Sequence, residues 1–252
     1  MIAVRWPLDS CDGVDTMTLS DSTEVVTTHD GGRMPAFVAR PRSGSGPGLV
    51  VLQEIFGVTD YIKQRARDLA ELGYVALVPQ LYWRLGSDVE LPENTPEGLQ
   101  QAFGYMQRLD EAQAVDDAAA ALEHLRAMPQ TNGTAGVLGF CMGGRLAYML
   151  AAASDPDVVV SYYGSGIASR LHDAPRITAP IVFHFGTADQ YLPLEEVERI
   201  RAAFADHPST EVHVHADAGH AFDNPSPMFH HQPASAEAWP QTAAFLKRHL
   251  PT

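Results

Sequence analysis

Apolar residues along the chain follow two patterns: short runs typical of strands, and repeats three to four residues apart typical of helices. Two apolar-rich runs, 24–29 and 35–40, flank the turn sequence DGG, which predicts an antiparallel hairpin. Residues 48–54 and 74–79 are almost continuously apolar, as expected of strands covered on both faces. Between them, residues 58–73 carry apolar side chains on one helical face and end near a glycine.

The rest of the chain continues this alternation of strands and helices. Thr95, Pro96 and Glu97 predict a helix start, because they combine a capping hydroxyl, a proline in the first turn and an acid near the positive end of the helix dipole. Further strands are predicted at 135–140, 158–164, 181–186 and 210–216, and further helices at 115–125, after residue 141, from about residue 194, and at 239–250.

Together these elements predict the α/β fold class, with a mostly parallel central sheet, an antiparallel N-terminal edge and helices on both faces. We expect residues 1–20 to form an N-terminal tail and residues 21–252 a single domain, because no long linker or internal repeat divides the chain. The longest irregular stretch inside this domain, residues 80–95, is a candidate site loop.

Composition and charge narrow the classes of function. Of the 252 residues, 45% are hydrophobic and 19% are charged, which is ample material for a solid core. The formal net charge of -14 argues against a nucleic-acid partner, which would need clustered lysine and arginine. No window has the run of about 20 apolar residues of a membrane span, and the N-terminal sequence lacks the apolar region of a secretory signal. We therefore expect a cytoplasmic protein with no membrane partner.

Cys141 stands in the sequence GFCMGG, between a predicted strand and a predicted helix. This is the context of a nucleophile elbow, usually written G-x-S-x-G, here with a central cysteine. Gly139 and Gly143 leave room for a tight turn, the helix N-terminus favours a thiolate, and the Met142 N–H points toward a developing oxyanion. Alone, the motif also fits a small buried cysteine that only lets the helix pack on the sheet. The second cysteine, Cys11, is expected to be a free thiol.

Two further positions favour a catalytic interpretation. Asp189 follows the predicted strand 181–186, and His220 follows the predicted strand 210–216. A nucleophile, an acid and a histidine in this chain order, each at the carboxyl end of a strand, match the order in α/β-hydrolases. Taken singly, the aspartate could be a turn residue and the histidine a loop residue. The three together predict a triad in which Asp189 orients His220 and His220 takes the proton of Cys141.

Other histidines and a serine are weaker candidates. His213 and His215 lie on one face of a predicted strand, and His230 and His231 are neighbours, but neither pair has a third ligand at a usable spacing. We interpret both pairs as surface residues and predict no metal site. Ser165, in the sequence GSG, lacks the elbow spacing and is interpreted as a loop residue. The predicted triad needs no metal and no organic cofactor.

The stretches QEIFGV, GYVALVPQLYWR, GFCMGG, YYG, GTADQYLP and AGHAF occur in this order between about residues 24 and 250. In this respect the sequence resembles the dienelactone hydrolase (carboxymethylenebutenolidase) family of the α/β-hydrolase superfamily. The resemblance implies an α/β-hydrolase fold and a hydrolase that cleaves a small ester or lactone through a Cys-His-Asp triad and an acyl-enzyme. We expect a small-molecule substrate, and a monomer or a homodimer.

The resemblance also implies roles for residues around the triad. Glu54 would hold the resting thiol in a neutral pair and release it as a thiolate when substrate displaces the carboxylate. The N–H groups of Ile55 and Met142 would form the oxyanion hole. Arg84, in LYWR, would bind a substrate carboxylate. Aromatic side chains implied to line the substrate pocket are Tyr82, Tyr162, Tyr163 and Phe222.

The sequence departs from the family four positions after the histidine. The family's dienelactone enzymes carry a second arginine there for the substrate carboxylate, and this sequence has Asn224 beside Asp223. An amide matches neither the charge nor the bidentate geometry of a guanidinium, so Asn224 would contact the substrate differently. One alternative is therefore a general carboxylesterase or thioesterase acting on neutral acyl groups. Another is a non-catalytic or redox-responsive protein of the same fold, with Cys11 as the resolving thiol.

Overall fold

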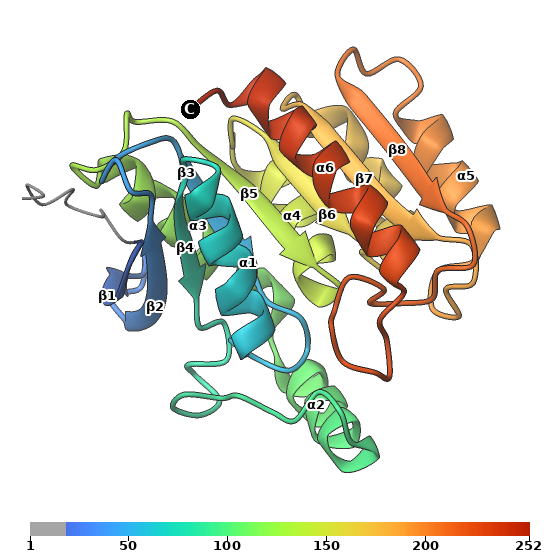
Figure 1. Ribbon diagram of the computed structural model, residues 1–252, viewed down its shortest axis with the longest axis horizontal. Coiled ribbons are helices and arrows are strands. Elements are labelled where there is room, and N and C mark those ends of the chain that lie inside the picture. The colour runs from blue at the N-terminus through green and yellow to red at the C-terminus, as the bar shows by residue number, and fades with distance from the viewer. Residues whose placement is uncertain (1–18) are drawn as a thin grey trace, which may run out of the picture.

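The computed structural model describes residues 19–252, whose strands form one central sheet in the order β1-β2-β4-β3-β5-β6-β7-β8 (Figure 1). β2 runs antiparallel to both of its neighbours, and the other neighbouring pairs are parallel. This arrangement confirms the predicted fold class. The strands are β1 (Ser20–Thr27), β2 (Arg33–Arg40), β3 (Gly48–Leu52), β4 (Val75–Pro79), β5 (Ala135–Phe140), β6 (Val159–Tyr162), β7 (Ile181–Gly186) and β8 (Thr210–His215).

The N-terminal hairpin is longer than its apolar residues suggest. β1 begins at Ser20 rather than near residue 24, and its first residues pair with the end of β2. These residues are polar because β1 is an edge strand with an exposed side, so the apolar pattern marks only its second half. All but the last two residues of the predicted tail, Cys11 included, lie outside the described residues.

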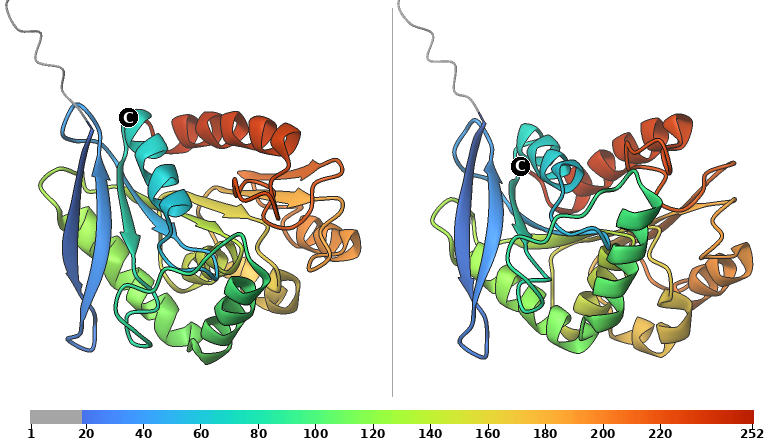
Figure 2. Two further views of the ribbon diagram at one scale, coloured as in Figure 1. Left: turned by 60° about the horizontal axis from the view of Figure 1, so that its bottom comes forward. Right: turned by 90° about the horizontal axis from the view of Figure 1, so that it is seen from below.

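Two layers of helices sandwich the sheet (Figures 1 and 2). α1 and α6 cover one face, and α3, α4 and α5 cover the other. α2 lies beyond the carboxyl ends of the parallel strands (Figure 1), where it can reach a site at that edge. The helices are α1 (Asp60–Glu71), α2 (Pro96–Arg108), α3 (Glu111–Ala127), α4 (Met142–Ala153), the 3₁₀ helix η1 (Ile167–Arg176), α5 (Leu194–Ala203) and α6 (Gln232–His249).

The central strand β3 shows why its sequence is continuously apolar. Leu49 and Val51 pack into the core beneath α1 and α6, whereas Val50 and Leu52 pack into the core beneath α3 and α4. All four side chains are fully buried. Successive residues of a strand point to opposite faces, so a strand covered on both sides has no polar positions.

Side-chain capping at the N-terminus explains why the start of α2 could be predicted from the sequence. The Thr95 side chain accepts a hydrogen bond from the Gly98 N–H at 3.0 Å, as expected of the N-cap of α2. Asp110 caps α3 in the same way through the Gln113 N–H. η1 was not predicted, because its 3₁₀ geometry lacks the 3.6-residue period and it contains Pro175.

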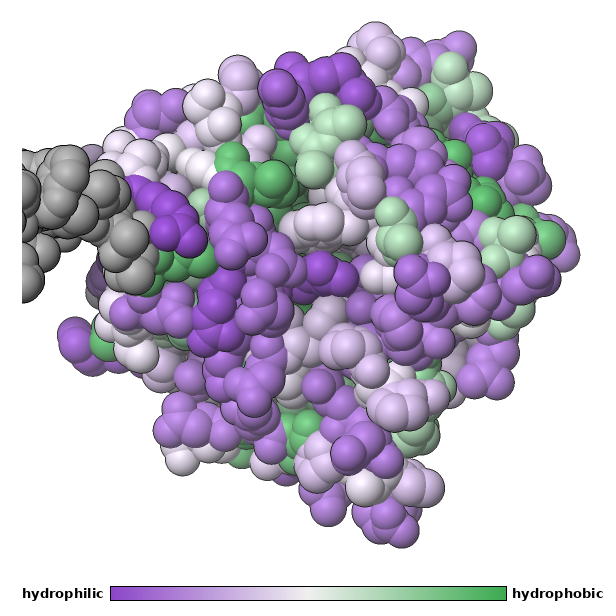
Figure 3. All heavy atoms as spheres, viewed as in Figure 1, coloured by the Kyte–Doolittle hydropathy of each residue, from purple (hydrophilic) through white to green (hydrophobic). Residues whose placement is uncertain are grey.

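The outer face over α1 and α6 is mostly hydrophilic, with apolar side chains scattered among polar ones (Figure 3). This is the expected surface of helices whose apolar stripes face a sheet. Within residues 19–252, no helix is both long and apolar enough to cross a membrane.

The turn from β5 into α4 depends on glycines because backbone segments meet there. A Cβ atom at Gly139 would overlap the carbonyl of Gly143, and one at Gly143 would overlap the carbonyl oxygens of Leu52 and Gln53 at the end of β3. Both glycines were predicted to leave room for the turn, and the close approach of the backbone segments explains why they are needed.

Gly143→Ala should therefore destabilise the protein by about 2 kcal/mol or more, because the added methyl group forces backbone segments apart. The matched control is Gly104→Ala in α2, where a Cβ atom meets no atom within 4 Å. This control should stabilise the protein by roughly 0.5–1 kcal/mol, because alanine favours a helix over glycine. Chemical denaturation of both variants measures these changes, and equal effects would contradict the packing argument.

Candidate active site

Cys141 lies in the turn between β5 and α4 with a strained backbone, φ 54° and ψ -117°. A non-glycine residue rarely adopts a positive φ, and strain of this kind concentrates at functional sites. The Cys141 N–H donates to the Tyr162 carbonyl at 3.0 Å, which ties the turn to β6. The cysteine sulfur lies 3.0 Å from Nε2 of His220. The turn therefore directs the thiol at the histidine.

Asp189 extends this contact into a line of three side chains. Its Oδ2 lies 2.8 Å from Nδ1 of His220, and its Oδ1 accepts a hydrogen bond from the Tyr191 N–H at 2.8 Å. The carboxylate is fully buried and held on both oxygens. Cys141, Asp189 and His220 follow β5, β7 and β8, so all three lie at the carboxyl edge of the sheet. The structure brings the three predicted residues together.

The surroundings of His220 favour its protonated form. Burial would lower the pKa of the imidazole, but the nearby Cys141 sulfur and the hydrogen bond that the ring donates to Asp189 outweigh burial and raise the pKa of His220 well above its ordinary value. The rings of Tyr163 and Tyr191 meet the imidazole edge-on, with centroids 5.4 and 5.1 Å away. These surroundings hold the imidazole in place beside the Cys141 sulfur.

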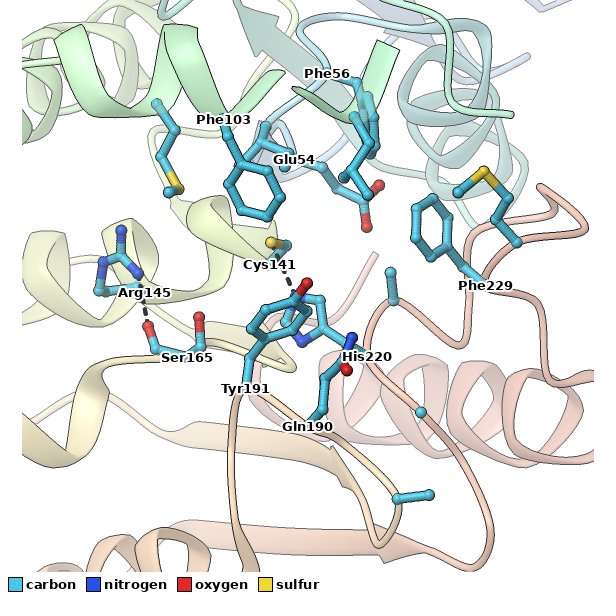
Figure 4. Close-up of a pocket in the computed structure, with 17 residues that line it drawn as sticks. Glu54, Phe56, Phe103, Cys141, Arg145, Ser165, Gln190, Tyr191, His220 and Phe229 are labelled. Atoms are coloured by element: carbon cyan, nitrogen blue, oxygen red, sulfur yellow. Dashed lines mark hydrogen bonds between the residues drawn. The ribbon is translucent and has the colours of Figure 1, made fainter. Parts of the chain in front are cut away.

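The cysteine and histidine face a cavity of about 440 Å³ (Figure 4), a size typical of small-molecule sites. Arg145 and Ser165 lie on one side of Cys141, and Phe229 lies on the other (Figure 4). Most of the wall is apolar. The apolar part of the wall comes from the segment after β3, from α2 and from the segment before α6. Its residues are Ile55, Phe56, Leu99, Phe103, Met106, Met228 and Phe229.

Two backbone segments at the site, the one after β3 and the start of α4, carry N–H groups. Met142 is the first residue of α4, and N–H groups in the first turn of a helix have no carbonyl partner within it. Ile55 follows β3 and lines the cavity. The Tyr82 hydroxyl donates to the Ile55 carbonyl at 3.0 Å and lies 3.6 Å from the Met142 sulfur. Tyr82, predicted as a substrate contact, is instead buried behind the cavity, where it fixes both segments.

Glu54 lines the cavity with a buried carboxyl group whose two oxygens differ. Oε2 accepts a hydrogen bond from Asn224 Nδ2 at 2.7 Å, whereas Oε1 has no hydrogen-bond partner among the described residues. Burial and then the charge of Glu93 raise the pKa of Glu54 to about 8, against the opposing effects of Asn224 and His220. At pH 7 the carboxyl group is therefore mostly neutral.

The resemblance implied that Glu54 pairs with the resting thiol, but the structure shows no such pair. The Cys141 sulfur contacts His220, and Asn224 holds Glu54. Asn224 Nδ2 also donates to Glu93 Oε1 at 2.9 Å, so one amide nitrogen bridges two carboxyl groups. Asn224 is fully buried and does not line the cavity, which corrects its prediction as a substrate contact.

Arg84 does not reach the cavity either, which corrects the predicted contact with a substrate carboxylate. Its Nε and Nη2 lie 3.2 and 2.9 Å from the carboxylate of Asp117, and its Nη1 lies 2.9 Å from Asp30. Its guanidinium stacks on Trp83, with Cζ 4.1 Å from the ring centroid. Asp117 is buried, so Arg84 compensates a charge that would otherwise be unpaired inside the protein.

The remaining predicted aromatic contacts are buried beneath the site instead of lining it. The Tyr162 hydroxyl lies 2.6 Å from the Thr242 hydroxyl, and the Tyr163 hydroxyl lies 3.3 Å from that of Tyr61. Phe222 packs edge-on against the Tyr163 ring, with centroids 5.1 Å apart. These side chains support the floor of the site, because all their faces are covered by protein.

Several residues that line the cavity were not predicted from the sequence. Leu99, Phe103 and Met106 lie on one face of α2 and line the cavity. Their spacing of four and three residues is a helical signal that could have identified them. Arg145 lies one turn beyond the cysteine on α4, a spacing that also indicates proximity. The predicted site loop, residues 80–95, contributes no lining residue, and the helix that follows it does.

The two histidine pairs occupy different environments. His215 is buried, with its Nε2 3.1 Å from Nδ1 of His184, which corrects its interpretation as a surface residue. The cause is α6, which covers β7 and β8. His213 is half-buried and stacks on His184, whereas His230 is exposed and His231 half-buried. Within residues 19–252, no group of three or more His, Cys, Asp or Glu side chains is arranged to hold a metal ion.

Comparison with known proteins agrees with this geometry. The model of the Dienelactone hydrolase family matches residues 34–250. The chain belongs to this family. It is 35% identical to carboxymethylenebutenolidase 1 of Cupriavidus pinatubonensis over 228 residues, 90% of this chain and 97% of that protein. It is 33% identical to the carboxymethylenebutenolidase of Pseudomonas putida over 221 residues, 88% of this chain and 94% of that protein.

Solved structures of the family share the fold. A Klebsiella pneumoniae protein assigned to the dienelactone hydrolases matches with a TM-score of 0.80 and 27% identity, covering 92% of this chain and 99% of that one. A dienelactone hydrolase-like promiscuous phosphotriesterase from metagenomic libraries matches with a TM-score of 0.75 and 26% identity, covering 91% and 99%. The protein is thus an α/β-hydrolase-fold hydrolase of the carboxylic ester and lactone class.

The raised pKa of Glu54 makes a testable contribution to stability. Its pKa rises from an ordinary 4.5 to about 8, so the folded protein holds this proton more tightly than the unfolded chain. This contribution is complete below pH 4.5 and is lost as the pH rises through 8. Between these limits, the free energy of unfolding of the wild type should fall relative to that of Glu54→Gln by a few kcal/mol, at about 1.4 kcal/mol for each tenfold difference in proton affinity.

Urea denaturation at several pH values measures this difference. Glu71→Gln, an exposed change at the end of α1, is the control for the substitution itself. Parallel pH profiles for wild type and Glu54→Gln would show that the Glu54 pKa is close to its ordinary value.

Proposed function

We propose that Cys141 is the nucleophile that cleaves a small ester or lactone through a covalent acyl-enzyme, with His220 as its base and Asp189 as the residue that orients the base. The observation that supports this most strongly is the line of contacts from sulfur to Nε2 at 3.0 Å and from Nδ1 to carboxylate at 2.8 Å. A thiolate attacks faster than a thiol, and an adjacent imidazole is the usual means of producing one.

In the first half of the reaction the Cys141 sulfur adds to the substrate carbonyl carbon and forms a tetrahedral oxyanion. The N–H groups of Ile55 and Met142 stabilise this charge, each contributing about 3 kcal/mol. When the oxyanion collapses, the bond to the leaving oxygen breaks, and the imidazolium of His220 gives this oxygen its proton. The acyl group remains on the sulfur as a thioester, and His220 is neutral again.

In the second half, neutral His220 takes a proton from a water molecule, whose oxygen attacks the thioester carbon. A second tetrahedral oxyanion forms in the same hole and expels the Cys141 sulfur as a thiolate. The carboxylic acid leaves, and His220 ends protonated beside the thiolate, which is the resting pair. Asp189 keeps Nδ1 of the imidazole protonated throughout, because its buried Oδ2 accepts that hydrogen bond.

A thioester substrate would pass through the same steps, so the thioesterase alternative shares this machinery. The non-catalytic alternative conflicts with the complete set of contacts around the strained cysteine. The redox-responsive alternative depends on Cys11, which lies outside the described residues.

Replacement of the nucleophile and replacement of the acid should lower kcat for p-nitrophenyl esters to different extents. Cys141→Ala should lower it about 10³-fold or more, because no nucleophile remains, and Asp189→Asn about 10²- to 10⁴-fold, because the amide favours the wrong tautomer of His220. Steady-state kinetics with p-nitrophenyl butyrate measures both losses, and circular dichroism melting curves establish that the variants are folded.

A folded Cys141→Ala protein with full activity would contradict the proposed nucleophile. A folded Asp189→Asn protein with full activity would contradict only the orienting role of the aspartate. The two results therefore separate the nucleophile from its supporting residues.

A further inference from the structure

The cavity wall offers a substrate little free charge. Most of its side chains are apolar, and α2 supplies one apolar side through Leu99, Phe103 and Met106. Among the described lining residues, Arg145 is the one with a permanent positive charge. Whether the site accepts a carboxylate therefore depends on what surrounds this arginine.

Arg145 is held by bonds within the protein through all three of its side-chain nitrogens. Its Nε and Nη2 donate to Glu111 Oε1 at 3.0 and 2.6 Å, and its Nη1 donates to the Ser165 carbonyl at 2.7 Å. The Arg145 side chain is 14% exposed. Its charge is thus compensated in a place where solvent screens weakly. The edge of the guanidinium that would form a bidentate pair with a substrate carboxylate is already occupied by Glu111.

A carboxylate that entered the cavity would meet Glu111 as a competitor. It would have to displace Glu111 or lie beside it, and the second case places two like charges next to each other. Displacement also has a cost, because Glu111 Oε2 binds Arg170 at 2.8 Å and anchors the start of α3. A group that repels one class of ligand gives selectivity without improving the fit of another.

The other described positions around the site offer a substrate carboxylate no free positive charge either. Arg84 is occupied by Asp117 and Asp30 away from the cavity, and Asn224 carries no charge. Glu54 lines the cavity with a carboxyl group instead of a cation. No free positive charge therefore replaces the missing arginine on the described cavity wall.

We infer that this cavity selects uncharged esters or lactones with an apolar acyl group, and that Glu111 sets this selectivity by occupying Arg145. The inference rests on the proposed function, since it concerns the substrate of the same site. Glu111 acts through Arg145 and does not itself line the cavity. It is therefore a positioning residue for specificity.

A pair of esters matched in length tests the inference. p-Nitrophenyl heptanoate and the p-nitrophenyl monoester of adipic acid differ mainly in a terminal ethyl group against a carboxylate. After subtraction of the uncatalysed rates, kcat/KM of the wild type should be at least 100-fold higher for the heptanoate. A wild type that prefers the adipate, or cleaves both equally well, would overturn the inference while leaving the proposed nucleophile intact.

Glu111→Gln should free the charge of Arg145. We expect kcat/KM for the adipate relative to the heptanoate to rise about tenfold or more, mainly through a lower KM, and the gain to vanish in the double variant Glu111→Gln, Arg145→Met. An unchanged ratio in a Glu111→Gln protein with a normal melting curve would overturn the role of Glu111. If this variant does not fold, Arg145→Met alone decides: it leaves the ratio unchanged if the arginine is occupied, whereas loss of adipate turnover would mean that Arg145 binds it.

Failure of the proposed function gives a different result. If the wild type cleaves neither ester, the proposed function fails and this inference fails with it. Cleavage of the heptanoate that is lost in Cys141→Ala, together with a ratio in favour of the adipate, overturns the inference alone.

Discussion

The strained turn at Cys141 is the constraint on which the rest of the site depends. Cys141 is held there at φ 54°. Gly139 and Gly143 on either side have no Cβ atom, so the backbones of β5, β3 and α4 can come into contact. The turn places the sulfur at the start of a helix and within 3.0 Å of His220. Without that turn, Asp189 and His220 would form only a buried acid–histidine pair at the edge of a sheet.

Compensation of charge is the second feature that shapes the site. Arg145, which lines the cavity, is occupied by Glu111, and Arg65, which does not line it, is occupied by Asp223 beside Asn224. Where the family's second arginine would stand, the Asn224 amide instead joins Glu54 to Glu93, and burial keeps Glu54 mostly neutral at pH 7. The groups that this compensation leaves free at the site are Cys141 and His220, which perform the proposed chemistry.

The sequence was sufficient for the fold and for placing Cys141, Asp189 and His220 at one edge of the sheet, because both predictions rest on local patterns. Continuous apolar runs mark strands with two covered faces, and the order of Cys141, Asp189 and His220 follows from where those strands end. The turn chemistry at Thr95 likewise located a helix start to the residue. Each of these features is decided within a few residues of chain, so tertiary contacts had little to change.

The substrate wall could not be predicted in the same way, because it depends on pairs distant in sequence. Arg84 points away from the cavity since Asp117 and Asp30 hold it, and neither is near it in the chain. Asn224 donates a hydrogen bond to Glu54, which lies 170 residues away in the sequence. The burial of His215 under α6 is of the same kind, since nothing in its own strand indicates that a helix covers it.

The central claim is that Cys141 carries the acyl group during turnover. Its most direct test is rapid quenching of the wild-type reaction with p-nitrophenyl acetate, followed by mass spectrometry of the digested protein. The account predicts one acetyl group on the peptide that contains Cys141, formed with the first equivalent of nitrophenolate and absent in Cys141→Ala. Nitrophenolate release with an acetyl group on another residue, or with no acetylated peptide at any time, would contradict it.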